Sequence, residues 1–240
     1  MICILCLVFG ICEAALLYGL RSFFVGIMLD GETYCGGALV QKEYVVTAAA
    51  CLDKDISRYS VRLHRLGLEA DFKADSFILH PGYYATYKPH SNIAIVKFHW
   101  PQSDSVKVDL DFVGISTFGY LNVSMVGWER MHGSANFNYS NLTLFDGSIC
   151  SFYYPFVDLD SEFCAGSLGR EMGSIDYGNP LIYSNEGIHV LVGIHSWSEP
   201  ILSYNSTSMF TRVSRFSRWI ESILDPLAYT SRIGFKRYTS

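Results

Sequence analysis

Residues 43–51 read EYVVTAAAC, a run of branched and aromatic residues that ends in three alanines and a cysteine. Such a run favours a β-strand, because branched and aromatic side chains suit a pleated, half-buried surface. Similar runs recur about every ten residues, separated by Gly, Pro, Asn, Asp or Ser. They span residues 23–29, 43–47, 60–66, 75–80, 93–98, 122–126 and 189–195. The pattern predicts an all-β barrel or sandwich.

One segment near the C-terminus has helical periodicity instead. Its apolar residues fall on one face at helical spacing, namely Phe216, Trp219, Ile220, Ile223 and Leu224. Ser214 precedes them as a candidate N-cap, and Pro226 follows them. The sequence therefore predicts a single amphipathic helix at the end of an all-β chain.

The composition is that of a folded protein with an acidic balance. The 240 residues are 50% hydrophobic and 17% charged, with a formal net charge of -5. A chain of this length buries a large core, in one domain or in two closely packed lobes. Its Lys and Arg are scattered, so we expect no nucleic-acid partner. The sequence contains no Gly-rich phosphate loop and no cluster with metal-ligand spacing, and we expect no metal and no other cofactor.

The N-terminus carries an apolar run over residues 2–11, followed by small residues at Ala14 and Ala15. The run is too short to span a bilayer, and the small residues suit cleavage of a secretory signal. We expect residues 1–14 to be a signal peptide, and the mature protein to be secreted and extracellular, with no membrane partner. A buried N-terminal strand is the alternative interpretation.

Cysteine usage agrees with export. Three cysteines would leave with the signal peptide, and the four that remain are Cys35, Cys51, Cys150 and Cys164. An even number in a secreted chain indicates two disulfides, and the residues alone leave three connectivities open. The N-x-Ser/Thr sequons give the candidate glycosylation sites Asn122, Asn138, Asn141 and Asn205. Asn122 lies in a strand-like run and is the weakest of these candidates.

The chain resembles the trypsin/chymotrypsin family of serine proteases from about residue 16 to residue 224. The resemblance rests on TAAAC at 47–51, NIAI at 92–95 and DYGNPL at 176–181, where the family has TAAHC, DIAL and DSGGPL. Shorter matches in family order are CGGAL at 35–39, VGW at 126–128, CAG at 164–166, GIHSW at 193–197 and FTRV at 210–213.

This resemblance implies two packed six-stranded antiparallel β-barrels with a C-terminal helix and a site in the cleft between the barrels. The domain would cover residues 15–224, with lobes of about 15–110 and 111–224, and a tail at 225–240. The resemblance also implies the disulfides Cys35–Cys51 and Cys150–Cys164.

The resemblance places Ala50 at the position of the base His, Asn92 at that of the orienting Asp, and Tyr177 at that of the nucleophilic Ser. Acyl transfer needs an activated hydroxyl, a base and donors for the oxyanion. Ala50 has no titratable group, and a phenol whose pKa is near 10 is a poor nucleophile without a base. Ile175 replaces a glycine whose N–H serves as an oxyanion donor. We therefore expect no catalytic residue and no enzymatic activity.

The primary specificity pocket is altered as well. By resemblance its positions are Glu171, Trp197, Ser198 and Ser208. The large ring of Tyr177 would block much of its entrance. His90 and His195 are the two candidates for a relocated base, and a structural role is the favoured interpretation of both.

The leading expectation is a secreted, inactive protease homologue that binds an extracellular protein. The chain is similar to the short, triad-deficient protease paralogues of parasitic mites, and this resemblance implies interference with host defence, with complement or a cascade protease as the partner. One alternative is a weakly active or altered serine hydrolase. Another is a decoy or cofactor in an extracellular proteolytic cascade, and a decoy requires an open cleft.

Overall fold

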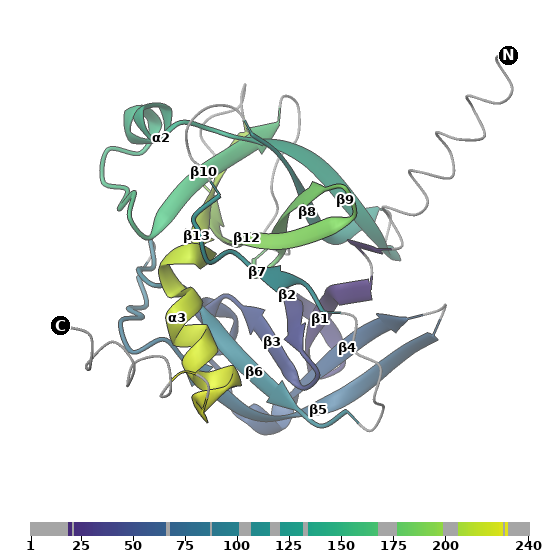
Figure 1. Cartoon of the computed structure of the whole chain (residues 1–240). Helices are drawn as coiled ribbons and strands as arrows, with labels where there is room; N and C mark the ends of the chain where they lie inside the picture. The colour runs from purple at the N-terminus through teal and green to yellow at the C-terminus, as the bar shows by residue number, and fades with distance from the viewer. Residues whose placement is uncertain are drawn as a thin grey trace, which may run out of the picture.

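The computed structural model describes residues 19–20, 22–65, 68–86, 88–100, 107–115, 121–131, 134–167, 177–198, 206–227 and 229. Two β-barrels lie one against the other, and helix α3 (Val213–Leu224) runs beside the first barrel (Figure 1). None of the helices in the described part of the chain is long and apolar enough to cross a membrane.

The first barrel is a closed antiparallel sheet in the order β1-β2-β3-β6-β5-β4. Its strands are β1 (Phe24–Leu29), β2 (Glu32–Gln41), β3 (Tyr44–Thr47), β4 (Tyr59–Arg65), β5 (Leu68–Leu79) and β6 (Ala94–Phe98). Branched side chains such as Val25, Val61 and Val96 fill its interior and are buried. Strand β2 was not among the strand-like runs of the sequence, because the adjacent Gly36 and Gly37 interrupt its pattern.

The second barrel closes through β11, which pairs with both β8 and β12. Its strands are β8 (Leu121–Met131), β9 (Ser134–Leu144), β10 (Glu162–Ser167), β11 (Pro180–Asn185), β12 (Ile188–Ser198) and β13 (Ser206–Arg212). The short strand β7 (Asp109–Leu110) adds to it in parallel with β12. The prediction of two six-stranded antiparallel barrels is confirmed.

Helix α3 confirms the predicted C-terminal helix but begins earlier than expected. Strand β13 runs directly into it, so Arg212 occupies the N-cap position without a side-chain cap bond, and Ser214 lies inside the first turn. The prediction of Ser214 as N-cap is therefore wrong. Phe216 is buried in a hydrophobic cluster that includes residues of both barrels, and its ring lies 4.9 Å from that of His80. The end of the chain thus ties the second barrel to the first.

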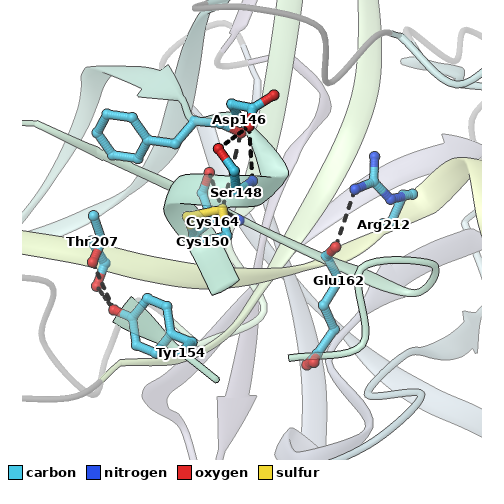
Figure 2. Close-up of a disulfide and its surroundings, with 9 residues drawn as sticks. Asp146, Ser148, Cys150, Tyr154, Glu162, Cys164, Thr207 and Arg212 are labelled. Atoms are coloured by element: carbon cyan, nitrogen blue, oxygen red, sulfur yellow. Dashed lines mark hydrogen bonds between the residues drawn. A yellow bond between two sulfur atoms is a disulfide. The ribbon is translucent and has the colours of Figure 1, made fainter. Parts of the chain in front are cut away.

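The described residues also form short helices. Among them are η1 (Ala49–Cys51), η2 (Ile56–Arg58) and α2 (Gly147–Tyr153). Asp146 is the N-cap of α2, and its carboxylate accepts a hydrogen bond of 2.8 Å from the Ser148 N–H. Figure 2 shows this cap above the disulfide that joins α2 to β10.

Both disulfides pair as the resemblance implied. Cys35 on β2 is joined to Cys51 in η1, with 6.2 Å between their Cα atoms. Cys150 on α2 is joined to Cys164 on β10, with a corresponding distance of 5.6 Å. The first bridge fixes the segment that carries Ala50, because Cys51 is its neighbour in η1.

Candidate functional site

Two of the degenerate positions meet through a hydrogen bond within the first barrel. Ala50 lies in η1 after β3, and Asn92 lies just before β6. The backbone N–H of Ala50 donates to Oδ1 of Asn92 over 2.9 Å. Nδ2 of Asn92 donates to Oγ of Ser196 on β12 over 2.9 Å. The buried carboxamide therefore links the first barrel to the second and is already engaged at both ends.

The chemistry available at these two positions is limited. Ala50 presents a methyl group, which neither accepts nor returns a proton. Asn92 is buried to 1% exposure and carries no charge at any ordinary pH. This pair can hold a loop in place, but it cannot act as the base and orienting acid of acyl transfer.

Tyr177 is held at the mouth of the second barrel by its own backbone. Its carbonyl accepts a hydrogen bond of 2.9 Å from the N–H of Gly36, so the first barrel fixes its position. The next residue, Gly178, donates its N–H to the carbonyl of His195 over 3.0 Å. Gly178 has φ +76, and a Cβ there would lie 2.4 Å from the carbonyl oxygen of Gly36. A side chain is therefore excluded at this turn.

The ring of Tyr177 packs inward instead of facing an open cleft. It stacks on the imidazole of His195, with 5.4 Å between ring centroids and 19° between planes. It also packs against a cluster that contains Trp197, Met209 and the Cys150–Cys164 bridge. The half-buried ring therefore lies between this cluster and His195.

His195 joins two of the residues assigned to the specificity pocket. The imidazole is fully buried, and its Nε2 lies 3.0 Å from Oγ of Ser198. That hydroxyl lies 2.8 Å from Oγ of Ser208 on the neighbouring strand. The stack of Tyr177 on His195 thus continues into a pair of hydrogen-bonded hydroxyls. His90, the other candidate base, is exposed on the loop before β6.

Asn179 is a site residue that sequence reasoning missed. Its side chain is fully buried between Gly36 of the first barrel and Gly127 of the second. A Cβ on Gly36 would lie 1.8 Å from Oδ1 of Asn179, and one on Gly127 would lie 2.0 Å from Nδ2. The two glycines leave room for the carboxamide, which explains why an amide is tolerated inside DYGNPL. The sequence did contain a signal for this site, since residue 179 is Asn where the family motif DSGGPL has its second glycine.

Glu162 is a second residue that the sequence analysis missed. It begins β10, on the same face of the strand as Cys164, and is only 4% exposed. Its Oε1 accepts a hydrogen bond of 3.3 Å from the indole N–H of Trp197. Burial raises the pKa of this carboxyl, while the Trp197 hydrogen bond and the charge of His90 partly oppose the shift. The sequence gives no local signal for it, because distant residues such as Trp197 bury this carboxyl.

Replacing Glu162 by Gln is expected to stabilise the fold at pH 7. The pKa of the buried carboxyl lies above its ordinary value of 4.5, so the carboxyl favours the folded state only while protonated. That contribution is complete below pH 4.5 and is lost as the pH rises through the folded-state pKa. Thermal melting should therefore give Glu162→Gln a higher Tm than the native chain at pH 7, and the gain should shrink towards pH 4.5.

Asp158 supplies a control with the opposite sign. Hydrogen bonding from Ser161 lowers the pKa of the Asp158 carboxyl, so its ionised form favours the folded state above the ordinary value of 3.8. Asp158→Asn should lower the Tm at pH 7, and this deficit should fade as the pH falls through the lowered pKa. A Glu162→Gln variant that melts below the native chain at pH 7 would contradict the assignment of a raised pKa.

Several predicted positions lie outside the described residues. These are the oxyanion position Ile175, the pocket base Glu171 and the sequon Asn205. Asn122 and Asn141 have exposed side chains on β8 and β9, and the side chain of Asn138 is not described. Glycosylation therefore stays a prediction at all four sequons.

Two antiparallel barrels with a site between them, closed by a C-terminal helix, define the class of double-barrel serine-protease folds. Residues 18–220 match the family model described as Trypsin, and the chain belongs to this family.

Individual relatives agree with this assignment. The chain is 28% identical to coagulation factor IX of Cavia porcellus over 80% of its own length and 74% of that protein. It is 27% identical to trypsin-10 of Gadus morhua over 81% of its length and 83% of that protein. Among solved structures it is similar to kallikrein-related peptidase 10, with a TM-score of 0.72 and 22% identity over 86% of this chain and 96% of that chain. The last likeness concerns the fold alone.

Proposed function

We propose that this protein is a catalytically inactive member of the trypsin family that is secreted and acts by binding another extracellular protein. The observation that carries the proposal is the contact between Ala50 and Asn92. The backbone N–H of Ala50 donates over 2.9 Å to the side chain that would orient a base, and Ala50 itself has only a methyl group.

The packing of Tyr177 supports the same conclusion. Its ring stacks on His195 at 5.4 Å, so the phenol lies against an imidazole face rather than in line with one of its nitrogens. In-plane contact between a hydroxyl and a ring nitrogen is the geometry that general-base activation needs. A phenol without a base in hydrogen-bond geometry is a weak nucleophile.

Secretion is supported by two features. The disulfides Cys35–Cys51 and Cys150–Cys164 suit an oxidising compartment, and the apolar run at residues 2–11 suits a signal peptide. The partner proposed is an extracellular protein of host defence, of the complement type, or a protease of a cascade. One of the relatives is by its name a coagulation factor.

A weakly active hydrolase is the second candidate, and one contact favours it. The 3.0 Å distance between Nε2 of His195 and Oγ of Ser198 brings a base next to a hydroxyl. Two features of that pair count against hydrolase activity. The Ser198 hydroxyl also bonds Ser208, and the Tyr177 ring covers one face of the imidazole. A decoy that receives inhibitors through an open primary pocket is disfavoured by the same stacking.

Assays with an active-site-directed fluorophosphonate and a short ester substrate test the inactivity. The purified native chain should show neither labelling nor turnover, and Tyr177→Ser alone should not create either, because Ala50 supplies no base. Active trypsin is the positive control. Stoichiometric labelling of the native chain would overturn the proposal. If Ser198→Ala abolished that labelling and Tyr177→Phe did not, the His195–Ser198 pair would be its source.

Capture from extracellular fluid tests the binding function. The immobilised chain should retain one defined protein, and excess soluble chain should compete for it. Active trypsin with its serine chemically blocked is the matched control, since it has the same fold with an open site. Retention of the same proteins by both columns would contradict a specific binding function.

A further inference from the structure

Strands β8 and β9, which lie side by side in the second barrel, bring two of the sequons together (Figure 1). The sequon of Asn122 is at the start of β8, and that of Asn141 is near the end of β9. In the register of the strands, Asn122 is opposite Thr143, and Ser124 is opposite Asn141. Thr143 and Ser124 are the third residues of the two sequons, so each asparagine faces the hydroxyl residue of the other sequon.

This patch is on the outer face of the second barrel. Side chains alternate between the two faces of a strand. The residues that alternate with those of the sequons fill the core of the barrel, namely Val123, Met125, Leu142 and Leu144. Asn122 and Asn141 are therefore on the opposite face, and both of their side chains are exposed. A large substituent on either side chain extends into solvent and not into the core.

The contacts of Asn141 suit a modification of its side-chain nitrogen. Oγ of Ser124 donates a hydrogen bond to Oδ1 of Asn141 over 3.2 Å. Within the described part of the chain, no hydrogen bond engages Nδ2 of Asn141 or the side chain of Asn122. An N-linked glycan is attached through Nδ2, and Oδ1 remains an acceptor afterwards. The fold therefore loses no hydrogen bond when Asn141 is modified.

The third sequon of this hairpin, at Asn138, lies differently. Its third residue, Ser140, is 6% exposed, and the hydroxyl has no hydrogen-bond partner among the described residues. Ser140 precedes Leu142 of the barrel core by two positions, so both are on the inner face of β9. The same alternation assigns backbone position 138 to this inner face. A glycan there would prevent the barrel from closing, so folded molecules should lack it.

We propose that Asn122 and Asn141 carry N-linked glycans in the mature protein and that Asn138 carries none. In the transfer, Nδ2 of each asparagine attacks the anomeric carbon of a lipid-linked oligosaccharide diphosphate. The new C–N bond replaces the C–O bond to the diphosphate, which leaves with the lipid, and Nδ2 releases one proton. The proposal rests on the proposed secretion, because the donor and its transferase belong to the secretory pathway. It reverses the ranking from the sequence, in which Asn122 was the weakest candidate.

Glycans on this patch also limit where a partner protein can bind. Asn122 and Asn141 are diagonal neighbours on paired strands, a relation that places side chains about 7–8 Å apart. Glycans at both positions cover this end of the hairpin, so they leave a partner protein the other faces of the molecule.

The test maps glycans site by site on the chain produced in a eukaryotic cell line. The native chain is expressed beside a version in which the signal peptide of a known secreted protein replaces residues 1–14. A glycosidase converts each occupied asparagine to aspartate, and mass spectrometry of the peptides locates the change. Aspartate should appear at positions 122 and 141 of the secreted protein and not at position 138. Protein retained in the cells is mapped in the same way, so the result for positions 122 and 141 does not depend on export.

Single substitutions assign each glycan through the intact mass of the secreted protein. Asn122→Gln should remove one glycan. Thr143→Ala should also remove one, because it destroys the sequon of Asn141 while the asparagine itself stays in place. Thr143→Ser is the matched control, since it keeps the hydroxyl and should keep the glycan. Asn138→Gln should remove none. The Tm of each purified variant, measured alongside, shows that it is folded.

An unmodified Asn122 or Asn141, or a glycan on Asn138 in the secreted protein, would overturn the proposal. Failure of the proposed function gives a different result. If the native chain stays in the cells while the version with the foreign signal peptide is secreted with both glycans, the proposed secretion is wrong and the assignment of the glycan sites stands.

Discussion

Gly36→Ala is expected to destabilise the protein by about 3 kcal/mol or more. The added Cβ would lie 1.8 Å from Oδ1 and 2.9 Å from Cγ of Asn179, distances at which atoms overlap. Asn179 cannot turn away, because Gly127 encloses its Nδ2 from the other barrel. Chemical denaturation followed by tryptophan fluorescence measures the loss.

A second substitution should reverse much of this loss. Asn179→Gly removes the overlapping amide, and the remaining contact of the new Cβ, 3.1 Å from the Cα of residue 179, requires only a small shift. The double variant Gly36→Ala/Asn179→Gly should therefore be more stable than Gly36→Ala alone, with a coupling energy of about 2 kcal/mol. Gly147→Ala is the matched control, since its Cβ would meet only the flexible end of Leu159 at 3.1 Å, and it should change stability by less than about 1 kcal/mol. Additive effects of the two substitutions would show that the Asn179 amide does not fill this space.

Asn92→Leu is expected to cost about 2–3 kcal/mol, because it leaves the N–H of Ala50 and the hydroxyl of Ser196 without their buried partner. Leucine keeps the branching and the number of heavy atoms of the asparagine side chain, so the change removes the hydrogen bonds without leaving a cavity. The midpoint of denaturant unfolding at pH 7 gives the cost.

Asn92→Asp separates this structural role from a catalytic one. A carboxylate still accepts from the Ala50 N–H, and the Ser196 hydroxyl can turn to donate to it, so the fold should lose less than half of what Asn92→Leu costs. The Asp variant should still show no ester turnover, because Ala50 supplies no base beside it. A loss equal to that of Asn92→Leu would show that the carboxamide N–H, and not its oxygen, maintains the contact.

The fold was predictable from short-range patterns. Alternating β-branched residues mark β3, β6 and β12, and the spacing of Phe216 and Ile220 marks α3. These signals are local, because side chains alternate along a strand and return every three to four residues on a helix. The start of α3 was not predictable in this way, since β13 continues into it and leaves no room for a separate cap at Ser214.

The site was predictable only in part. Aligned motifs located Ala50, Asn92 and Tyr177, and composition showed which chemical groups each of them has. A motif does not show where a side chain points. The stack of Tyr177 on His195, with 5.4 Å between ring centroids, depends on the packing of two distant segments. Glu162 was overlooked because a charge at the start of a strand is ordinarily exposed, and only the cover provided by Trp197 and its neighbours buries it.

The sequence by itself determined the double-barrel class, the C-terminal helix and the identity of the residues at the former chemical positions, because these depend on local patterns and on aligned motifs. The tertiary structure decided which of those residues touch. Ala50 and Asn92 are 42 positions apart in the sequence, and Asn92 and Ser196 are 104 positions apart. The first contact forms when the first barrel closes, and the second forms only when the two barrels pack together. The stack of Tyr177 on His195 and the buried carboxyl of Glu162 are likewise properties of the packed fold.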